Sequence, residues 1–309
     1  MELLYQTEVT PDQIDHLGHM NVRFYGAHAR TGAERLLARL GITADEHQTV
    51  VGRDVYVRHL HEQLTGAPLE VRGGVLGGST VGLRLYEELV NPESGEVAAT
   101  FVLTFELADP TTRAPRALDD GLLTAALADT VVLPEQGRPR SIDLDDDPVA
   151  AAPTLEVLRD RGLAMRRPRV IDPGEIPVDE HGFVSPLATG ELVWGGEPLE
   201  DEAGFRPLEP LPGGGSMGFA TMETRASWAR VPRVGDRVQS FAAQLDLRPK
   251  TMLTRHWSVD VERHELVVVF TVVNLAFDLG ARRAMVIPDA VRQRLEERLH
   301  PDLSVVGLT

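Results

Sequence analysis

The sequence predicts an α+β protein made of two tandem repeats, each with one helix and a run of antiparallel strands. Three observations support this fold class. The length of 309 residues suits two domains of about 150 residues each. In the first half, a helical stripe is followed by strand-like alternation of apolar and polar residues. The second half repeats landmarks of the first at a nearly constant spacing.

The predicted helix runs from Val22 to Leu40, and Gly41 follows it as a C-terminal stop. Its apolar residues recur at helical spacing and form one stripe for burial against a sheet. The residues of this stripe are Tyr25, Ala29, Ala33, Leu36, Leu37 and Leu40.

Strand patterns follow in both halves. In the first half, alternation around residues 81–85 and 101–105 predicts two strands, and Asn91-Pro-Glu-Ser-Gly95 between them is typical of a hairpin turn. In the second half, strands are expected at 238–247, 253–261 and 266–277. A charged surface helix is expected at 287–299.

The repeat rests on positions that share one offset in residue number. Phe101, Asp109 and Arg113 map onto Phe270, Asp278 and Arg282 with a single offset, 270 − 101 = 169, and Gly66 maps onto Gly235 with the same value. We call this value the repeat offset. Near the start of each half, Asp15-His-Leu-Gly18 matches Asp179-Glu-His-Gly182 with a smaller offset, 179 − 15 = 164.

The change of offset implies an insertion in the second half, which we place in the loop 211–216. We therefore expect a first repeat at 1–133, an acidic, proline-containing linker at 134–168 and a second repeat at 169–309.

Composition excludes several classes of function. The formal net charge of −16 repels nucleic acid and anionic lipid, so neither is expected as a partner. There is no cysteine, which excludes thiolate metal sites and cysteine nucleophiles. The N-terminal residues lack the pattern of a signal peptide, and no apolar run is long enough to span a membrane. We therefore expect a cytoplasmic protein.

Residues 15–25 read DHLGHMNVRFY and are the most informative stretch of the chain. Here the sequence resembles the 4-hydroxybenzoyl-CoA-thioesterase-like branch of the hotdog superfamily, and the motif is closest to that of carnitine-related (betainyl-CoA) thioesterases. The family pattern is an aspartate, two variable residues, Gly-His-Met/Val-Asn and a tyrosine in the first turn of a long helix. The resemblance covers the first half clearly and reaches the second half only through the repeat.

The resemblance implies a fold in which a long antiparallel sheet wraps around one helix, and two such units pair to form a site. A chain with two repeats would supply that pair internally as a double hotdog, and its sheet edges would remain free for a homodimer of chains. It also implies hydrolysis of an acyl-CoA thioester to free acid and CoA. No cofactor is expected, because coenzyme A is part of the substrate.

The residues themselves agree with this chemistry. Thioester hydrolysis needs a base or nucleophile, for which Asp15 is the candidate, and donors for the oxyanion. The first N–H groups of a helix have no intrahelical partner, and the resemblance assigns the donor role to the backbone N–H of Val22. Gly18 permits a sharp turn and close approach of the thioester. Asn21 either caps the helix or orients a water, and His19 either bridges structural groups or transfers a proton.

Two further residues are weaker candidates for substrate binding. Tyr25 lies on the apolar stripe of the helix, where a role in the core competes with a role in the site. Lys250 is the single lysine and could meet a coenzyme A phosphate, although a solvated surface position is the alternative. His59 and His61 lie close to Glu62 in the sequence, but a metal site needs more converging ligands, so none is expected.

The second copy of the motif looks degenerate. Asp179 is kept, but Phe183 replaces the histidine and Ser185 replaces the asparagine. Pro186 stands at the position of the oxyanion donor and has no N–H to donate. We therefore expect one working site, led by Asp15.

Two alternatives to a thioesterase remain. A hotdog enoyl-CoA hydratase would pair an aspartate with a histidine five residues later, whereas His19 comes four residues after Asp15. A non-catalytic acyl-CoA-binding protein is the other alternative, but such regulators usually carry a DNA-binding domain, and none is evident here.

Overall fold

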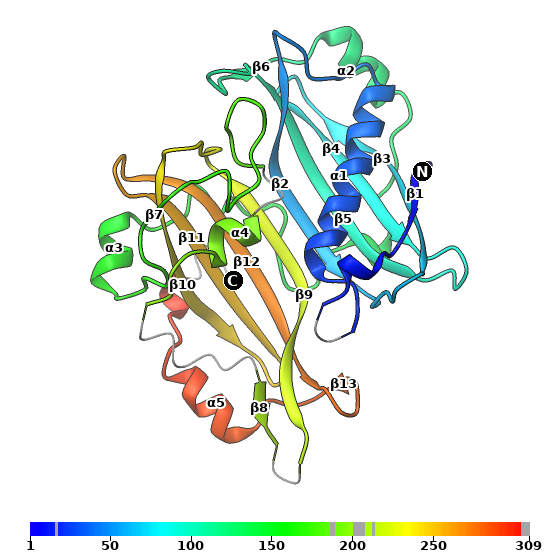
Figure 1. The fold of residues 1–309 in the computed structure, drawn as a ribbon. Helices are drawn as coiled ribbons and strands as arrows, with labels where there is room; N and C mark the ends of the chain where they lie inside the picture. Colours follow the sequence, from blue (N-terminus) through cyan, green and yellow to red (C-terminus); the bar gives the residue numbers. More distant parts are fainter. Residues whose placement is uncertain (16–17, 186–188, 200–207, 212–213, 304–309) are drawn as a thin grey trace. The chain divides into compact units, whose positions relative to one another are not determined.

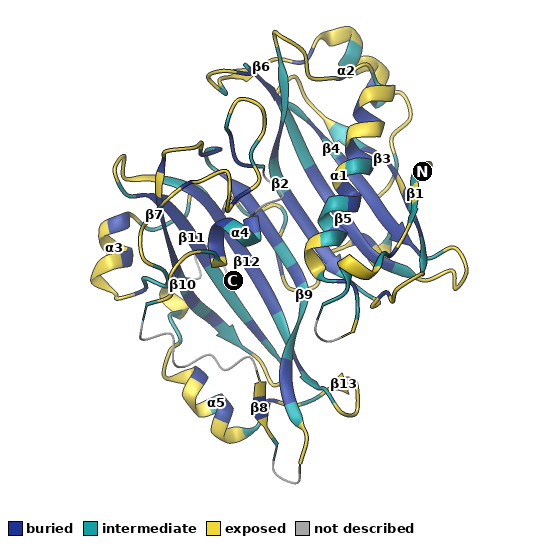
Figure 2. Cartoon of the chain, in the orientation of Figure 1, coloured by how far each residue is buried: buried dark blue, intermediate teal, exposed yellow. Residues whose placement is uncertain are grey.

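The predicted helix of the first half is present as α1 (Val22–Arg39). Asn21 is its N-cap, because the Asn21 side chain accepts a hydrogen bond from the backbone N–H of Arg23 at 3.1 Å. The predicted stripe is buried from Tyr25 to Leu37, and Figure 2 shows buried and exposed sides along this helix. Apolar periodicity therefore predicted both the helix and its buried face.

A computed structural model describes residues 1–15, 18–185, 189–199, 208–211 and 214–303. The chain divides into two compact units, Met1–Arg140 and Ser141–Thr309, called here the first unit and the second unit. No helix in the described part of the chain is long and apolar enough to cross a lipid bilayer.

The first unit is an antiparallel sheet with α1 packed against one part of it (Figure 1). The strand order is β1-β3-β4-β5-β2, with β6 paired to β5, and α1 contacts β1, β3 and β4. Its strands are β1 (Glu2–Glu8), β2 (Thr49–His59), β3 (Pro68–Gly78), β4 (Gly82–Val90), β5 (Val97–Ala108) and β6 (Pro115–Arg116). Its smaller helices are η1 (Pro11–Gln13), α2 (Asp120–Leu127) and η2 (Glu135–Gly137).

The second unit has a corresponding strand order, β9-β12-β11-β10-β7, with β8 paired to β9 and β13 to β12. Its strands are β7 (Arg169–Val170), β8 (Leu208–Pro210), β9 (Ser216–Trp228), β10 (Arg237–Leu247), β11 (Thr251–Asp260), β12 (Glu265–Asp278) and β13 (Arg283–Ala284). Its helices are α3 (Leu155–Asp160), α4 (Thr189–Trp194), α5 (Asp289–Glu296) and η5 (Pro301–Leu303).

The internal repeat is confirmed by matching backbone geometry. At the repeat offset, β3 and α2 coincide with β10 and α5. Gly66 and Gly235 have φ of 81° and 91°, and Arg113 and Arg282 have the rarer positive φ of 60° and 49°. Because arginine seldom adopts this conformation, its recurrence at equivalent turns is strong evidence for a shared fold.

The central helix differs between the units. α4 packs against β10 and β11 but has only six residues, whereas α1 has 18. Gly195 and Gly196 follow α4 directly, and Gly196 has a φ of 84°, which a helix does not continue. The described helix of the second unit therefore covers much less of its sheet.

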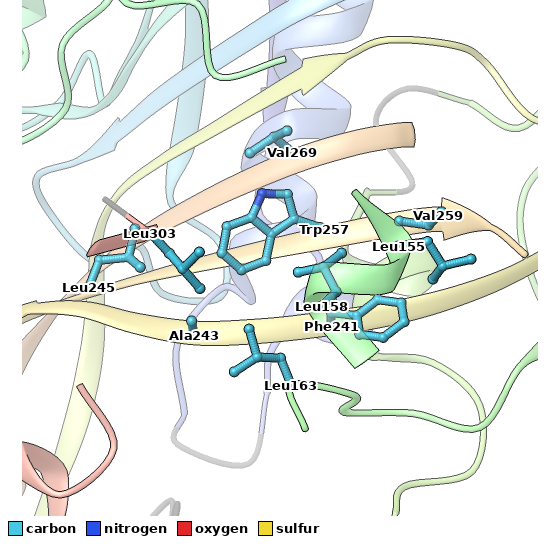
Figure 3. Packing of buried hydrophobic residues seen from close by; sticks show 10 residues of the cluster. All are labelled: Leu155, Leu158, Leu163, Phe241, Ala243, Leu245, Trp257, Val259, Val269 and Leu303. Carbon is cyan, nitrogen blue, oxygen red and sulfur yellow. The ribbon is translucent and has the colours of Figure 1, made fainter. Parts of the chain in front are cut away.

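The chain at 134–168, for which the sequence predicts a linker, contributes to both units. In the first unit, η2 lies beside Arg58, which donates hydrogen bonds to the carbonyl oxygens of Gln136 and Arg138. In the second unit, α3 covers one face of the sheet with a hydrophobic core around Trp257 (Figure 3). That core also contains Leu155, Leu158, Leu163, Phe241, Ala243, Leu245, Val259, Val269 and Leu303.

Candidate active site

The aspartate of the motif lies in a tight turn held by main-chain hydrogen bonds. The N–H of Asp15 donates to the carbonyl oxygen of His19 at 2.9 Å, and the N–H of Gly18 donates to that of Asp15 at 3.1 Å. Gly18 has a φ of 85°, which this turn requires and which favours glycine. A methyl group added at Gly18 would meet no atom within 4 Å, so the space beside the turn is open.

The turn is fixed to the rest of the first unit on two sides. The N–H of Met20 donates to the carbonyl oxygen of Gln63 at 2.8 Å, and the N–H of Asn21 donates to that of Gln13 at 2.9 Å. Met20 itself is buried. The Asp15 turn is therefore anchored immediately before α1 begins at Val22.

The structure brings the Asp15 carboxylate close to His19. His19 Nδ1 lies 3.6 Å from Asp15 Oδ2, and the side chains are 16% and 14% exposed. The other ring nitrogen, Nε2, lies 3.6 Å from Oε1 of Glu62. Asp15, His19 and Glu62 thus form a line of three polar side chains with the imidazole in the middle.

Glu62 was not predicted as a site residue. It is far from the motif in the sequence, and a contact between a turn and a distant strand end depends on the whole fold rather than on local spacing. The repeat shows which segment faces the turn. The N–H of Met20 donates to the carbonyl oxygen of Gln63, and the N–H of Val184 donates to that of Pro232 at the equivalent place in the second unit. Equivalent segments therefore face the aspartate turn in both units.

The start of α1 has an available donor. The N–H of Val22 makes no hydrogen bond within the described residues, whereas those of Arg23 and Phe24 bond to the Asn21 side chain and carbonyl oxygen. Val22 is 46% exposed. An unpaired N–H at the positive end of a helix is suited to binding a developing negative charge.

Tyr25 is buried beneath this site. Its hydroxyl donates to the carbonyl oxygen of His61 at 3.2 Å, and its ring packs edge-on against His59 at 5.3 Å. Burial raises the pKa of Tyr25 to about 12, and the negative charge of Asp15 acts in the same direction against an opposing backbone hydrogen bond. Burial lowers the pKa of His59 to about 4. Tyr25 therefore supports the site from the core as a neutral hydrogen-bond donor.

Lys250 lies in the second unit, in the turn between β10 and β11, and its side chain is exposed. Its carbonyl oxygen accepts a hydrogen bond from the N–H of Ala276 at 2.8 Å. The structure thus gives Lys250 a backbone role in its turn, and a contact with substrate stays a prediction.

The second copy of the turn keeps the backbone geometry but not the side chains around the aspartate. The N–H of Asp179 donates to the carbonyl oxygen of Phe183 at 2.8 Å, that of Gly182 donates to Asp179 at 3.0 Å, and Gly182 has a φ of 77°. Oδ1 of Asp179 accepts the N–H groups of His181 and Phe183 at 2.9 and 3.0 Å. Phe183 is buried at the position where the first turn has His19.

Ser185, at the position of Asn21, donates its N–H to the carbonyl oxygen of Pro177 at 3.0 Å, as Asn21 does to Gln13. Pro186, the predicted loss of the oxyanion donor, lies outside the described residues. What can be compared directly is therefore the loss of the imidazole and the inward bonding of Asp179.

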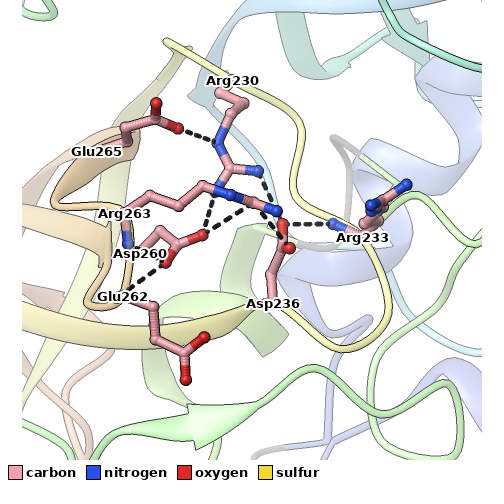
Figure 4. A network of polar contacts seen from close by, with 7 residues as sticks. All are labelled: Arg230, Arg233, Asp236, Asp260, Glu262, Arg263 and Glu265. Atoms are coloured by element: carbon pink, nitrogen blue, oxygen red, sulfur yellow. Dashed lines mark hydrogen bonds and ion pairs between the residues drawn. The ribbon is translucent and has the colours of Figure 1, made fainter.

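The second unit also contains an ion-pair network, formed by residues that come after the Asp179 turn in the sequence (Figure 4). Arg230 donates to Asp236 at 2.7 Å and to Asp260 at 2.6 Å, and Arg263 bonds to the same two aspartates. The position of Asp260 corresponds at the repeat offset to Asn91, which donates to Gln63 at 3.1 Å. The second unit has therefore replaced an uncharged support by a partly buried charged one.

Comparison with known families agrees with this description. Residues 9–131 match the model of the thioesterase-like superfamily. The betainyl-CoA thioesterase of Pseudomonas aeruginosa is 28% identical over 99 residues, which cover 31% of this chain. The match spans 62% of the length of that curated relative.

Two solved structures resemble the whole chain. A putative oleoyl thioesterase from Lactobacillus plantarum has a TM-score of 0.62 at 13% identity, and the match covers 92% of this chain and 95% of the other. The 12:0-ACP thioesterase from Umbellularia californica has a TM-score of 0.65 at 12% identity, with coverage of 88% and 93%. At such low sequence identity, the structural similarity shows that the fold is shared and nothing more. The first unit therefore resembles the thioesterase-like superfamily over residues 9–131, and the chain carries two units of the hotdog fold.

Proposed function

We propose that this chain hydrolyses an acyl-CoA thioester to a free acid and CoA at a site led by Asp15. One observation carries the proposal: the Asp15 carboxylate sits in an anchored turn directly before α1, whose first N–H is unpaired within the described residues. This arrangement offers a carboxylate for attack and a donor for the oxyanion.

In this proposal, the hydrogen-bond donor for the oxyanion is a backbone N–H group. The N–H of Val22 binds the thioester oxygen, and the field of the helix stabilises the negative charge that develops there during attack. The absence of a side chain at Gly18 lets the thioester lie against the turn, since no atom would meet an added methyl within 4 Å. Neither contribution depends on the side chain of Val22.

Asp15 acts by one of two routes. As a nucleophile, its oxygen attacks the carbonyl carbon, the CoA sulfur leaves with the bonding electrons and takes up a proton, and water then hydrolyses the mixed anhydride. As a general base, Asp15 takes a proton from a water that attacks the carbonyl directly. Both routes give one acid and one CoA thiol for one water.

His19 and Glu62 act in this proposal as positioning residues. The imidazole lies 3.6 Å from each of the two carboxylates, so it can bond to Asp15 through one nitrogen and to Glu62 through the other once substrate closes the gaps. Such a bridge fixes the direction of the Asp15 carboxylate before the reaction begins.

The second unit is proposed to be non-catalytic. Oδ1 of Asp179 accepts two N–H groups of its own turn, and a buried phenyl ring replaces the imidazole. In this proposal the phenyl ring of Phe183 cannot take the positioning role that the imidazole of His19 has beside Asp15.

The experiment measures thiol release from a panel of short, branched, aromatic and cationic acyl-CoA thioesters with dithiobis(nitrobenzoic acid). Because the chain has no cysteine, the enzyme does not consume the reagent. We expect hydrolysis of at least one thioester. Water addition to an enoyl-CoA without thiol release would instead establish a hydratase, and tight binding of the panel without turnover would establish a binding protein.

A single turnover in oxygen-18 water, with enzyme in excess, detects the nucleophilic route in which water attacks the carbonyl of Asp15. If Asp15 is the nucleophile and water attacks its carbonyl, the first acid released carries an unlabelled oxygen from Asp15. If Asp15 is the base, the label enters the acid in the first turnover. A cationic acyl group is included in the panel because the curated relative is named for betainyl-CoA.

A further inference from the structure

The second unit contains a cavity of about 740 Å³ on one face of its sheet. The floor is formed by β9–β12, and Trp194 at the end of α4 lies at one side. The even-numbered residues of β11 that line it, such as Thr254 and His256, point away from the core around Trp257, because successive residues of a strand face opposite sides. The cavity is therefore on the side of the sheet that α4 covers (Figure 1).

The repeat shows where this cavity comes from. In the first unit, a space of about 10 Å³ is lined by Leu37 of α1 together with Val50, Leu83 and Phe105, and it corresponds to one end of the large cavity. At the repeat offset, these three strand positions become Phe219, Met252 and Asn274, all of which line the large cavity. The later turns of α1 fill this space in the first unit, whereas the described α4 ends at Trp194.

The cavity has an apolar part and a polar end. Trp194, Phe219, Met252 and Val272 supply apolar surface, as in most small-molecule sites, and the volume lies in the range of such sites. Gln244 lies close to Arg298 and His300 at the polar end, because Gln244 bridges to Leu299 and its carbonyl oxygen accepts the N–H of His300 at 2.8 Å.

Among the described residues that line the cavity, the charge is opposite to that of the chain. The formal net charge of the chain is −16, yet no aspartate or glutamate is among the described residues that line the cavity. Arg166 and Arg298 both line it. Arg166 is already engaged, since its Nε donates to the carbonyl oxygen of Trp194 at 3.0 Å. Arg298 makes no ion pair within the described part of the chain and is the cation on which the inference rests.

Two buried polar atoms at the cavity lack partners. Nδ1 of His256 and Oε1 of Gln244 are buried without a hydrogen bond within the described residues, and His256 is 6% exposed. Buried polar atoms are nearly always bonded, so a ligand or water is expected to meet them, and Oε1 of Gln244, an acceptor, needs a donor such as water. Burial lowers the pKa of His256 to about 4, so its ring is neutral at neutral pH and one nitrogen can donate.

We propose that the second unit binds an amphipathic carboxylate in this cavity, with the apolar chain over β11 and β12 and the carboxylate at Arg298. The apolar floor excludes a wholly polar anion, and the arginines disfavour a cationic head. An uncharged chain would leave the charge-assisted bond to Arg298 unmade. The inference does not depend on hydrolysis by Asp15.

The test titrates the full chain with three probes of equal chain length: decanoate, decan-1-ol and decyltrimethylammonium. Binding is followed by isothermal titration calorimetry and by Trp194 fluorescence, with Trp194→Phe to identify the signal. We expect decanoate to bind roughly tenfold or more tightly than the alcohol, as expected for one charge-assisted hydrogen bond, and the cation to bind most weakly.

Variants locate the bound probe. Arg298→Gln should reduce decanoate affinity roughly tenfold and leave the alcohol unchanged, whereas the exposed Arg283→Gln, in the same unit, should change neither. Val272→Phe should weaken all three probes by filling the cavity, and Thr254→Met repeats that test should the first variant fail to fold.

The inference fails if decanoate does not bind, or if folded Arg298→Gln and cavity-filling variants bind it as the parent does. The Asp15→Asn variant tests this inference separately from the proposed hydrolysis. Decanoate should bind that variant unchanged even where thioesterase activity is absent. Loss of binding in Asp15→Asn would place the probe in the Asp15 site and overturn the inference.

Discussion

One position of the repeated sheet carries a buried titratable residue in each unit, and the two should respond to pH in opposite directions. Glu87 on β4 and His256 on β11 are related by the repeat offset and are 0% and 6% exposed. Both carboxyl oxygens of Glu87 and Nδ1 of His256 lack hydrogen-bond partners in the described part of the chain. Burial raises the pKa of Glu87 well above its usual 4.5 and lowers that of His256 from 6.5 to about 4.

The direction of each effect follows from linkage. Because the folded pKa of Glu87 is raised, its contribution to stability is complete below pH 4.5 and is lost as pH rises towards the folded pKa, by up to about 1.4 kcal/mol per pH unit. Because the folded pKa of His256 is depressed, its contribution is complete above pH 6.5 and is lost as pH falls towards about 4. That interval of about 2.5 pH units corresponds to roughly 3 kcal/mol.

Hydrogen exchange followed by mass spectrometry measures how the stability of each unit depends on pH. Peptides from β4 should lose protection as pH rises above 4.5, and peptides from β11 should lose it as pH falls from 6.5 towards about 4, after correction for the intrinsic exchange rate. Glu87→Gln should remove the first dependence alone, and His256→Leu the second alone. Unchanged pH slopes in these folded variants would refute the reasoning.

Three further predictions concern the site and its copy. Glu62→Gln should lower kcat by at most about fivefold and alter the acid limb of the pH–rate profile, because a half-exposed ion pair with His19 is worth about 1 kcal/mol or less; a loss of a hundredfold in steady-state assays would mean that Glu62 does more than position the ring. Gly18→Ala and Gly182→Ala should each lower stability by about 1–2 kcal/mol in denaturant titrations, since both glycines have positive φ, but only the first should reduce thioesterase activity; equal activity losses would contradict the assignment of one site. Asp236→Asn should lower the free energy of unfolding by about 1–3 kcal/mol, because it removes one of the two aspartates that Arg230 and Arg263 share in the network of Figure 4, and a melting temperature unchanged from the parent would show that the network contributes little.

Local patterns in the sequence predicted the elements that local physics determines. The apolar stripe predicted α1 almost to the residue, and Asn21 caps it. Asn91-Pro-Glu-Ser-Gly95 forms the predicted turn, in which the N–H of Gly95 donates to the carbonyl oxygen of Asn91 at 2.8 Å. The repeat offset predicted the shared fold of the two units, because equivalent turns need the same unusual backbone conformations.

Features that depend on long-range packing were not predictable from the sequence. Glu62 lies close to His19 because the chain after β2 packs against the Asp15 turn, and no spacing pattern in the sequence predicts that contact. The segment containing Leu158 looks like a linker from its acidic and proline-rich composition, yet its few apolar residues are buried against β10 and β11. The second half of the sequence does not signal the cavity, beside which the described α4 has only six residues. The cytoplasmic location, the homodimer and the internal pairing of the two units stay predictions.

The central claim is that one of two geometrically matched turns performs the chemistry. Asp15→Asn and Asp179→Asn are isosteric changes in turns with the same main-chain hydrogen bonds, so each is the control for the other. The measurement is kcat/KM for the best thioester of the panel, with folding checked by circular dichroism and melting temperature. Asp15→Asn should lose at least about 100-fold, while Asp179→Asn should stay within a few-fold of the parent. Near-parental activity in a folded Asp15→Asn enzyme, or an inactive Asp179→Asn enzyme that still folds, would contradict the account.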